Sequence, residues 1–293
     1  GWAHFATTRG GQDGIAIDLL DGLLNVIEVI QFDHADYDVW YDALNLGLRL
    51  TPVAGTDYMP PASPYLPGRE RFYTRVNGPL TYEAWLDGVR RGRTIVSNGP
   101  MLELAVDGKA IGEGIPLRSP GNVQVEGAVR FDPERDDIER LEFIVNGDVV
   151  RTFTGDGKSG EIGCRFSHPV SETCWMALRV SGKKRIEGFS PFGPKHQYFR
   201  DPSPAVAHTA AFYVTVANTP ALASQGRAKI IAQKWLGRLL DLESRLMNDN
   251  NLRTLAAFPG AGDQMPAEYL LKTRNELLQR IALAKTRFQE LAK

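Results

Sequence analysis

Short apolar runs alternate with amphipathic segments over the first hundred residues. Four of these runs are rich in β-branched or aromatic residues and are bounded by polar ones, which predicts strands; they cover 25–32, 49–55, 71–76 and 93–98. Two segments between them predict helices, over 37–47 and over 81–92, each ending on a glycine. Strands that alternate with helices are typical of βα units around a mostly parallel sheet, so residues 1–98 are expected to form an α/β domain.

The pattern changes at residue 99 and stays strand-like as far as residue 217. The clearest signal is a pair of alternating runs over 140–153, joined by Asn146-Gly147. Asn-Gly favours a two-residue hairpin turn because both central positions of a type I′ turn need positive φ, and we expect this turn to be an exposed tip. Further strand-like runs follow at the spacing of a sandwich. Residues 99–217 are therefore expected to form an antiparallel β-sandwich.

Beyond residue 217 the apolar positions recur every three or four residues, which is typical of amphipathic helices. One stripe consists of Ile231, Trp235, Leu239, Leu242 and Leu246, and a second of Leu270, Leu277, Ile281, Ala284, Phe288 and Leu291. The stretch 258–266 contains prolines and glycines that interrupt any continuous helix. We expect residues 218–293 to form a helical hairpin, packed on itself or on the sandwich.

Composition narrows the classes of partner. Hydrophobic residues make up 43% of the chain and charged residues 24%, which is typical of a globular protein. The formal net charge of -1 gives no global field that would recruit nucleic acid or an anionic membrane, and no apolar run reaches the length of a membrane-spanning helix. We therefore expect neither a nucleic-acid nor a membrane partner. The two cysteines, Cys164 and Cys174, are expected to be buried free thiols, with a hairpin disulfide as the alternative.

Candidate chemistry lies in the first hundred residues, near the ends of predicted strands. His4 follows a short apolar run, and Asp57 closes the turn Gly55-Thr56-Asp57 after the strand 49–55. Imidazole and carboxylate groups at the C-terminal ends of parallel strands are where α/β folds place ligands. Glu28 stands inside an apolar strand, where its burial is costly unless it is paired.

Each residue also has a structural interpretation. His4 after a strand can serve as a hydrogen-bonded structural residue, and Asp57 in a turn can cap backbone N–H groups. A salt bridge from Arg9 or Arg49 would equally explain Glu28. Residue spacing alone leaves these alternatives open.

Residues 52–114 closely resemble the carbamate-hydrolase branch of the PHP metallohydrolases, the CehA/McbA-like proteins. The resemblance is carried by the turn Gly55-Thr56-Asp57, by GRER followed by FYTRV, and by the run EAWLDGVRRGRTIVSNGP. It extends over about residues 1–217 and excludes the C-terminal helices. It implies a distorted (β/α) barrel with divalent metal ions that activate water, of which this chain would carry the C-terminal part.

Within that resemblance, His4 is similar to a ligand at the end of a middle strand, and Asp57 to the aspartate of a closing Asp-X-His turn. Here the closing turn reads Asp57-Tyr58-Met59, so methionine, a poor ligand for such ions, replaces the histidine. The His-X-His pair of the family's front half does not occur in the sequence. We therefore expect divalent ions in the full-length protein and none tightly bound in this chain.

The first functional hypothesis is part of a metal-dependent hydrolase that cleaves an ester, amide, carbamate or phosphoester bond in a small-molecule substrate. The second is a non-catalytic binding or scaffold protein, with a relic barrel and a sandwich that binds a partner or a glycan. The third is a structural platform formed by residues 1–98 in a larger assembly. Because proteins of the resembling family are often exported, the expected compartment leans outside the cytoplasm.

Overall fold

The computed structural model describes residues 2–3, 15–31, 34–56, 67–185, 204–217, 219, 225–248 and 267–291. Contacts group these residues into two units, which are described one at a time below. The first unit holds the described residues of 1–9 and 25–223, and the second holds those of 10–24 and 224–293. This grouping differs from the three segments expected from the sequence, and independent folding of 1–98 and 99–217 stays a prediction.

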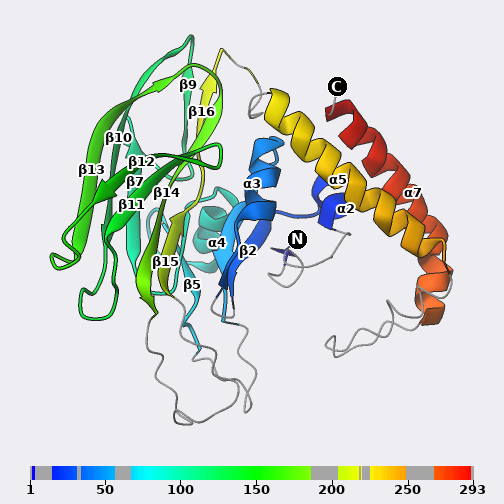
Figure 1. The fold of residues 1–293 in the computed structure, drawn as a ribbon, viewed down its shortest axis with the longest axis horizontal. Coiled ribbons are helices and arrows are strands. Elements are labelled where there is room, and N and C mark those ends of the chain that lie inside the picture. Colours follow the sequence, from blue (N-terminus) through cyan, green and yellow to red (C-terminus); the bar gives the residue numbers. More distant parts are fainter. Residues whose placement is uncertain are drawn as a thin grey trace. The chain divides into compact units, whose positions relative to one another are not determined.

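A small, mostly parallel sheet opens the first unit (Figure 1). Its described strands are β1 (Trp2–Ala3), β2 (Val26–Gln31), β3 (His34–Ala35) and β4 (Thr51–Ala54). β2 pairs in parallel with both β1 and β4, and β3 adds a short antiparallel pairing at its end. All six residues of β2 are buried, as expected for a central strand of a covered parallel sheet.

Helix α3 (Asp38–Asn45) follows from the predicted segment 37–47. Its apolar residues form one face, and Trp40 is fully buried with its indole N–H donating to the carbonyl oxygen of Leu50 at 3.0 Å. The helix ends before Gly47, whose φ of 80° allows the left-handed turn that L side chains resist. The predicted helix is confirmed.

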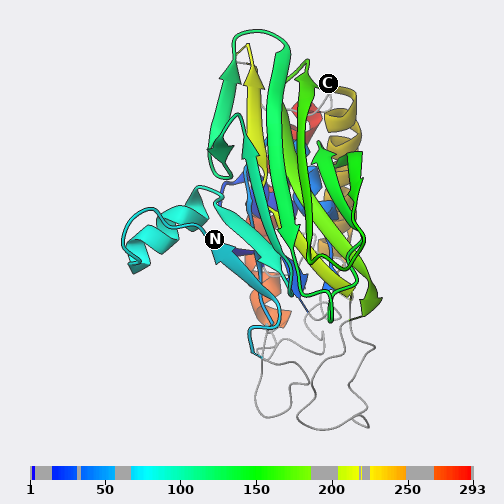
Figure 2. The same cartoon turned by 90° about the vertical axis from the view of Figure 1, so that its left-hand side faces the viewer.

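Two sheets face each other in the sandwich (Figure 2). One has the order β13-β10-β7-β8 among the described strands, which span Glu161–Val170, Gly121–Arg130, Met101–Val106 and Lys109–Ala110. The other has the order β12-β11-β14-β15-β6-β5, with strands Asp148–Thr154, Arg140–Val145, Cys174–Arg185, Pro204–Thr209, Thr94–Ser97 and Arg71–Thr74. β16 (Phe212–Val216) pairs with β14 and, in parallel, with β9 (Gly114–Leu117).

The sandwich core is one apolar cluster that draws on both sheets. Leu102 and Val125 come from the smaller sheet, and Phe143, Leu178 and Phe212 from the larger, each with no exposed surface. Such a core is what alternating strands produce when their inward faces meet. The predicted strand-rich segment and its hairpin at 140–153 are confirmed, but the larger sheet also contains β5 and β6, which precede residue 99.

Strands β5 and β6 depart from the expected parallel arrangement. They pair antiparallel with each other, and β6 pairs antiparallel with β15, so both belong to the larger sheet of the sandwich. Asn98 fixes this position, because its amide accepts from Val206 N at 2.7 Å and donates to the Pro204 carbonyl at 3.0 Å. Among the described strands, no sheet closes into a barrel.

Helix α4 (Tyr82–Arg90) lies to one side of the first unit (Figure 2). Thr81 caps it as predicted, since its hydroxyl accepts from Ala84 N at 3.1 Å. The rings of Trp85 and Phe72 lie 5.8 Å apart and join α4 to β5.

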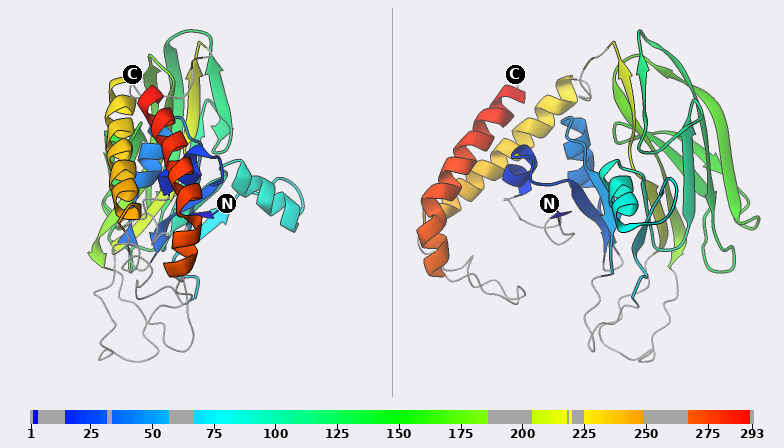
Figure 3. Two further views of the ribbon diagram at one scale, coloured as in Figure 1. Left: turned by 90° about the vertical axis from the view of Figure 1, so that its right-hand side faces the viewer. Right: turned by 180° about the vertical axis from the view of Figure 1, so that it is seen from behind.

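The second unit is helical, and Figure 3 shows its two long helices side by side and antiparallel. They are α5 (Gln225–Leu246) and α7 (Ala267–Leu291), and their predicted apolar stripes meet where Trp235 stacks on Phe288. A short helix, α2 (Ile15–Leu20), completes the unit, because Arg280 of α7 donates to Asp18 at 2.8 Å and to Asp21 at 3.0 Å. The predicted helical pair is confirmed.

None of the described helices is long and apolar enough to cross a membrane. Cys164 lies on β13 and Cys174 on β14, and both are free thiols, as expected; Cys174 is buried as expected, whereas Cys164 is only half-buried. Burial raises the pKa of Cys164 to about 11 and that of Cys174 to about 12, so both remain protonated and unreactive near neutral pH.

Candidate functional site

In the sequence, three predicted site residues lie on or shortly after parallel strands of the small sheet. Ala3 of β1 lies opposite Ile27, and Glu28 of β2 lies opposite Val53 of β4, so the three strands end at the same side of the sheet. His4 is the residue after β1, and Asp57 comes three residues after β4. Both His4 and Asp57 lie outside the described residues, so only Glu28 is placed by the structure.

The carboxyl group of Glu28 lies against the start of the Gly-Thr-Asp turn. Glu28 is only 4% exposed, and a Cβ atom at Gly55 would lie 2.5 Å from Glu28 Oε1. A side chain at position 55 would therefore have to displace the Glu28 carboxyl group. The Glu28 carboxyl group on β2 thus lies beside Gly55, the first residue of the turn that leads in sequence to Asp57.

Arg49, one of two proposed partners of Glu28, is engaged elsewhere. Its guanidinium lies 4.4 Å from the centre of the Tyr213 ring, in the geometry of a cation–π contact. The structural interpretation that Arg49 neutralises Glu28 is therefore wrong. Arg9, the other proposed partner, lies outside the described residues.

A second buried carboxyl group, which the sequence interpretation missed, belongs to Glu70. Glu70 is 1% exposed, and its backbone carbonyl accepts from the Thr56 hydroxyl at 3.2 Å, beside the Gly-Thr-Asp turn. Arg69 Nε lies 4.0 Å from Glu70 Oε1, with both side chains largely buried. In the sequence Glu70 stands between Arg69 and Arg71. Charged residues in such a run are usually exposed, so the sequence gave no indication that Glu70 is buried.

The described residues alone do not form a metal site. No group of three or more His, Cys, Asp or Glu side chains among them is placed to hold an ion. The donor chemistry of the candidate set is nevertheless suitable, because one imidazole and carboxylate oxygens are ligands that zinc and similar divalent ions accept in proteins. A metal at this edge would therefore need His4 and Asp57 in addition to Glu28.

A buried histidine joins α3 to the sandwich. His208 is fully buried, its Nδ1 lies 2.7 Å from the Thr209 carbonyl oxygen, and its Nε2 lies 2.5 Å from the Tyr41 hydroxyl. A carbonyl oxygen can only accept, so Nδ1 carries the proton and Nε2 accepts from Tyr41. The imidazole is thereby fixed in one tautomer between two elements.

The charge state of this junction is also fixed. Burial, opposed by the Thr209 hydrogen bond and reinforced by the nearby Arg179 guanidinium, lowers the pKa of His208 to about 3. Burial likewise raises the pKa of Tyr41. Arg179 forms an ion pair with Glu142 at 2.8 Å. The neutral His208 and the neutral Tyr41 therefore have a structural role, because their hydrogen bond joins α3 to the sandwich. The sequence alone gave no indication of this role for His208.

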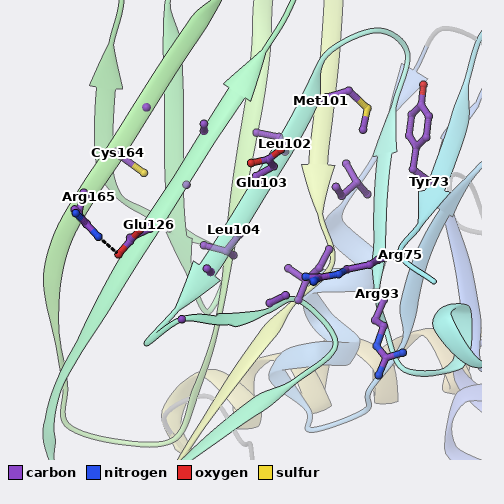
Figure 4. Close-up of a pocket in the computed structure, with 18 of the residues that line it drawn as sticks. Tyr73, Arg75, Arg93, Met101, Leu102, Glu103, Leu104, Glu126, Cys164 and Arg165 are labelled. Carbon is purple, nitrogen blue, oxygen red and sulfur yellow. Dashed lines mark hydrogen bonds and ion pairs between the residues drawn. The ribbon is translucent and has the colours of Figure 1, made fainter. Parts of the chain in front are cut away.

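A groove of about 800 Å³ lies on the smaller sheet of the sandwich (Figure 4). Glu103, Glu126 and Arg165 line it from the sheet, whereas Tyr73 and Arg75 line it from the region of β5. The groove is separate in sequence from the strand edge that carries Glu28. It is another place on the first unit where a ligand could bind.

No protein-family model matches the chain, and no curated protein matches it. The resemblance to the CehA/McbA-like proteins therefore rests on the motifs in residues 52–114.

Proposed function

We propose that the chain supplies part of the active site of a metal-dependent hydrolase of the PHP type. The observation that carries the proposal is the contact of the buried Glu28 carboxyl group with Gly55, at the common end of three parallel strands. His4 follows one of these strands and Asp57 follows another. This is the arrangement of acidic and imidazole groups that such folds use for ligands.

In this proposal His4 and Asp57 are metal ligands, and Glu28 is an additional site residue. A bound divalent ion would supply the hydrolytic chemistry by lowering the pKa of water. The backbone at Gly55 holds the Glu28 carboxyl group in a confined position, and β2 excludes bulk water from it because every residue of the strand is buried. The remaining ligands and the barrel that closes the site are those which the family resemblance implies.

The test measures hydrolysis by the natural protein that carries this sequence, with and without added Mn²⁺. The substrates are p-nitrophenyl acetate, bis(p-nitrophenyl) phosphate and 1-naphthyl N-methylcarbamate. We expect metal-dependent hydrolysis of at least one of them. It should fall by at least about a hundredfold in His4→Ala, Asp57→Asn and Glu28→Gln, because each removes a ligand or a site charge.

Glu83→Gln is the matched control for Glu28→Gln, because Glu83 is an exposed acid in the first turn of α4 and should retain full activity. Thermal unfolding of each variant separates loss of activity from loss of fold. Equal activity of Glu28→Gln and Glu83→Gln, or hydrolysis that persists in chelator, would contradict the assignment. Absence of activity on all three substrate classes would favour the non-catalytic scaffold hypothesis.

A further inference from the structure

The groove on the smaller sheet owes its depth to the side chains that face outward from three neighbouring strands. Glu103 of β7, Ala128 of β10 and Gly163 of β13 form one cross-strand row. Ala128 in the centre of that row carries only a methyl group and Gly163 beside it only a hydrogen, whereas the neighbouring outward positions on β10 and β13 carry the long side chains of Glu126, Arg130, Glu161 and Arg165. The hollow and its walls enclose about 800 Å³, a volume in the range of small-molecule sites.

The walls of the groove are largely apolar. Met101 and Tyr73 stand on facing sides and are each 37% exposed, which is high for such residues, and Figure 4 shows the Met101 sulfur on the side toward Tyr73. Ile95 and Ile111 also line it. Apolar surface left open in this way gains free energy when an apolar ligand covers it.

The charged groups on the sheet side of the groove satisfy one another. Arg165 pairs with Glu126 at 2.6 Å across β13 and β10. Arg130 pairs with Glu103 at 2.9 Å and lies 3.5 Å from Glu161. These acidic groups therefore have cationic partners already, and they add no free charge for a ligand to neutralise.

The opposite wall carries an uncompensated positive charge. Arg93 Nη1 lies 3.6 Å from a carboxylate oxygen of Asp87. Both carboxylate oxygens of Asp87 also accept from Arg91 Nε, at 2.9 and 2.8 Å. For Arg75, no carboxylate among the described residues lies within ion-pair distance, and its guanidinium is exposed at the groove. A negatively charged group of a ligand would therefore pair with Arg75.

We propose that this groove binds an elongated apolar molecule that ends in a carboxylate, such as a medium-chain fatty acid. The apolar chain would lie along the hollow over Ala128 and Gly163, and the carboxylate would meet the guanidinium of Arg75, whose fork matches two carboxylate oxygens. A glycan fits less well, because its many hydroxyls need free polar partners and the sheet-side charges are mutually paired. The site is independent of the proposed metal centre.

The experiment is isothermal titration calorimetry of the chain with decanoate, and with decanol as the uncharged analogue. Gly163→Leu fills the hollow with little strain, because a Cβ at this glycine meets only the Gly127 carbonyl oxygen at 3.9 Å. Arg75→Gln removes the charge while its backbone N–H still donates to the Arg93 carbonyl at 2.9 Å. Arg140→Gln, an exposed arginine on β11 outside the groove, is the matched control.

We expect decanoate to bind the unmodified chain and the Arg140→Gln control equally. Its dissociation constant should rise about tenfold or more in Arg75→Gln, since a charge-assisted contact is lost, while that of decanol stays the same. Binding of both should disappear in Gly163→Leu. Ala128→Leu gives a second way to fill the hollow if circular dichroism shows that Gly163→Leu is misfolded.

Three results would overturn the proposal. These are absence of decanoate binding to the unmodified chain, equal binding by the filled variants, and an equal dissociation constant in Arg75→Gln and Arg140→Gln. The last result would place the carboxylate away from Arg75. If the protein hydrolyses one of the three substrates, retention of that activity in Gly163→Leu would separate this site from the metal centre, and the titration with decanoate tests the groove even without any hydrolysis.

Discussion

Two buried polar side chains in the first unit have different surroundings. Glu28 sits against a glycine that leaves room for its carboxyl group, whereas His208 is neutral and held by two hydrogen bonds. A neutral buried imidazole costs little as long as both ring nitrogens have partners. It becomes costly when acid conditions favour the charged form, because that form can no longer be solvated.

His208 should therefore make the first unit sensitive to acid. Its pKa is about 3 in the folded protein and 6.5 in an unfolded chain, so the unfolded state binds more protons between these values. The free energy of unfolding should then decrease as pH falls from 6.5 toward 3, by up to about 1.4 kcal/mol per pH unit from this residue. Chemical denaturation of His208→Gln at several pH values should show a shallower decrease.

His168→Gln is the comparison for this measurement. His168 is only partly buried, and burial together with Arg151 lowers its pKa less. Its replacement should change the pH dependence less than His208→Gln does. Equal slopes in the unmodified chain and in His208→Gln would show that the imidazole is not held neutral by burial.

The sequence could reveal Glu28 but not its surroundings. A glutamate inside an apolar run can be recognised without a structure, because the run of apolar residues predicts a buried strand and the acidic residue within it stands out. The role of Gly55, the burial of Glu70 and the Tyr41–His208 contact all depend on residues far apart in sequence. These features appear only when tertiary neighbours are known.

At the scale of elements, the hydrophobic periodicity of the sequence predicted the helices and strands, but it did not predict which strands pair with each other. Thr81 and Gly92 marked the ends of α4, and Asn146-Gly147 marked the hairpin between β11 and β12. The runs that became β5 and β6 predicted strands correctly, yet nothing local indicates that β6 pairs with β15 more than a hundred residues later. Strand pairing is decided by packing, which a local pattern does not record.

The hairpin turn also differs from expectation in its exposure. Asn146 and Gly147 have φ values of 52° and 94°, as a type I′ turn requires. The tip is half-buried against α3, since Asn45 donates to the Asn146 carbonyl at 3.2 Å and Tyr41 approaches Gly147. The expected exposed tip is therefore wrong, because the sandwich packs this turn on a helix from the preceding segment.

Replacement of Gly147 by valine should cost more stability than the turn geometry alone explains. The twin turn Asp107-Gly108 has φ values of 47° and 74°, and a Cβ at Gly108 would meet nothing within 4 Å. We expect Gly108→Val to lower the free energy of unfolding by about 2 kcal/mol, from left-handed strain alone. Gly147→Val should add about 1 kcal/mol, because a Cβ at Gly147 already lies 3.3 Å from Tyr41 Cδ2.

Denaturant unfolding of the two valine variants measures the difference. A Tyr41→Ala background provides the control, because it removes the ring that the new side chain would meet. The excess cost at Gly147 should shrink there. An equal loss of unfolding free energy in Gly108→Val and Gly147→Val, both without the Tyr41→Ala change, would mean that the turn does not pack against α3.

At the scale of the whole molecule, the chain is built from two compact units, and the helical one is assembled from separate stretches of sequence. α2 belongs with α5 and α7, although some two hundred residues stand between it and α5 in the printed sequence. The sequence predicted the apolar stripes of α5 and α7. It did not predict the place of α2, because a six-residue helix carries too short a pattern.

Arg280 provides a test of that grouping. Its guanidinium bridges α7 to Asp18 and Asp21, so Arg280→Gln should loosen the helical unit and leave the sandwich unchanged. We expect a loss of about 1 kcal/mol or less, because the ion pairs are partly exposed. Trp235 reports on the helical unit, and Trp40 and Trp175 report on the other, so single-tryptophan variants follow each unit separately.

Arg238→Gln is the matched control, since Arg238 lies on α5 over Trp235, and no hydrogen bond or ion pair joins it to α2 among the described residues. The Trp235 transition should shift in Arg280→Gln, and the Trp175 transition should not. A shift of both transitions together would show that the chain unfolds as one cooperative body.

The position of α2 has a consequence for how the protein is made. On the ribosome α2 emerges before the strands of the sandwich, while α7, which contacts it in the folded protein, is synthesised after them. The sandwich strands are complete in the interval, and the sandwich can fold before the helices do. Throughout that time α2, whose Ile15, Ile17 and Leu19 are buried in the folded protein, lacks its contact with α7, so the nascent chain presents a short apolar segment for chaperones to hold.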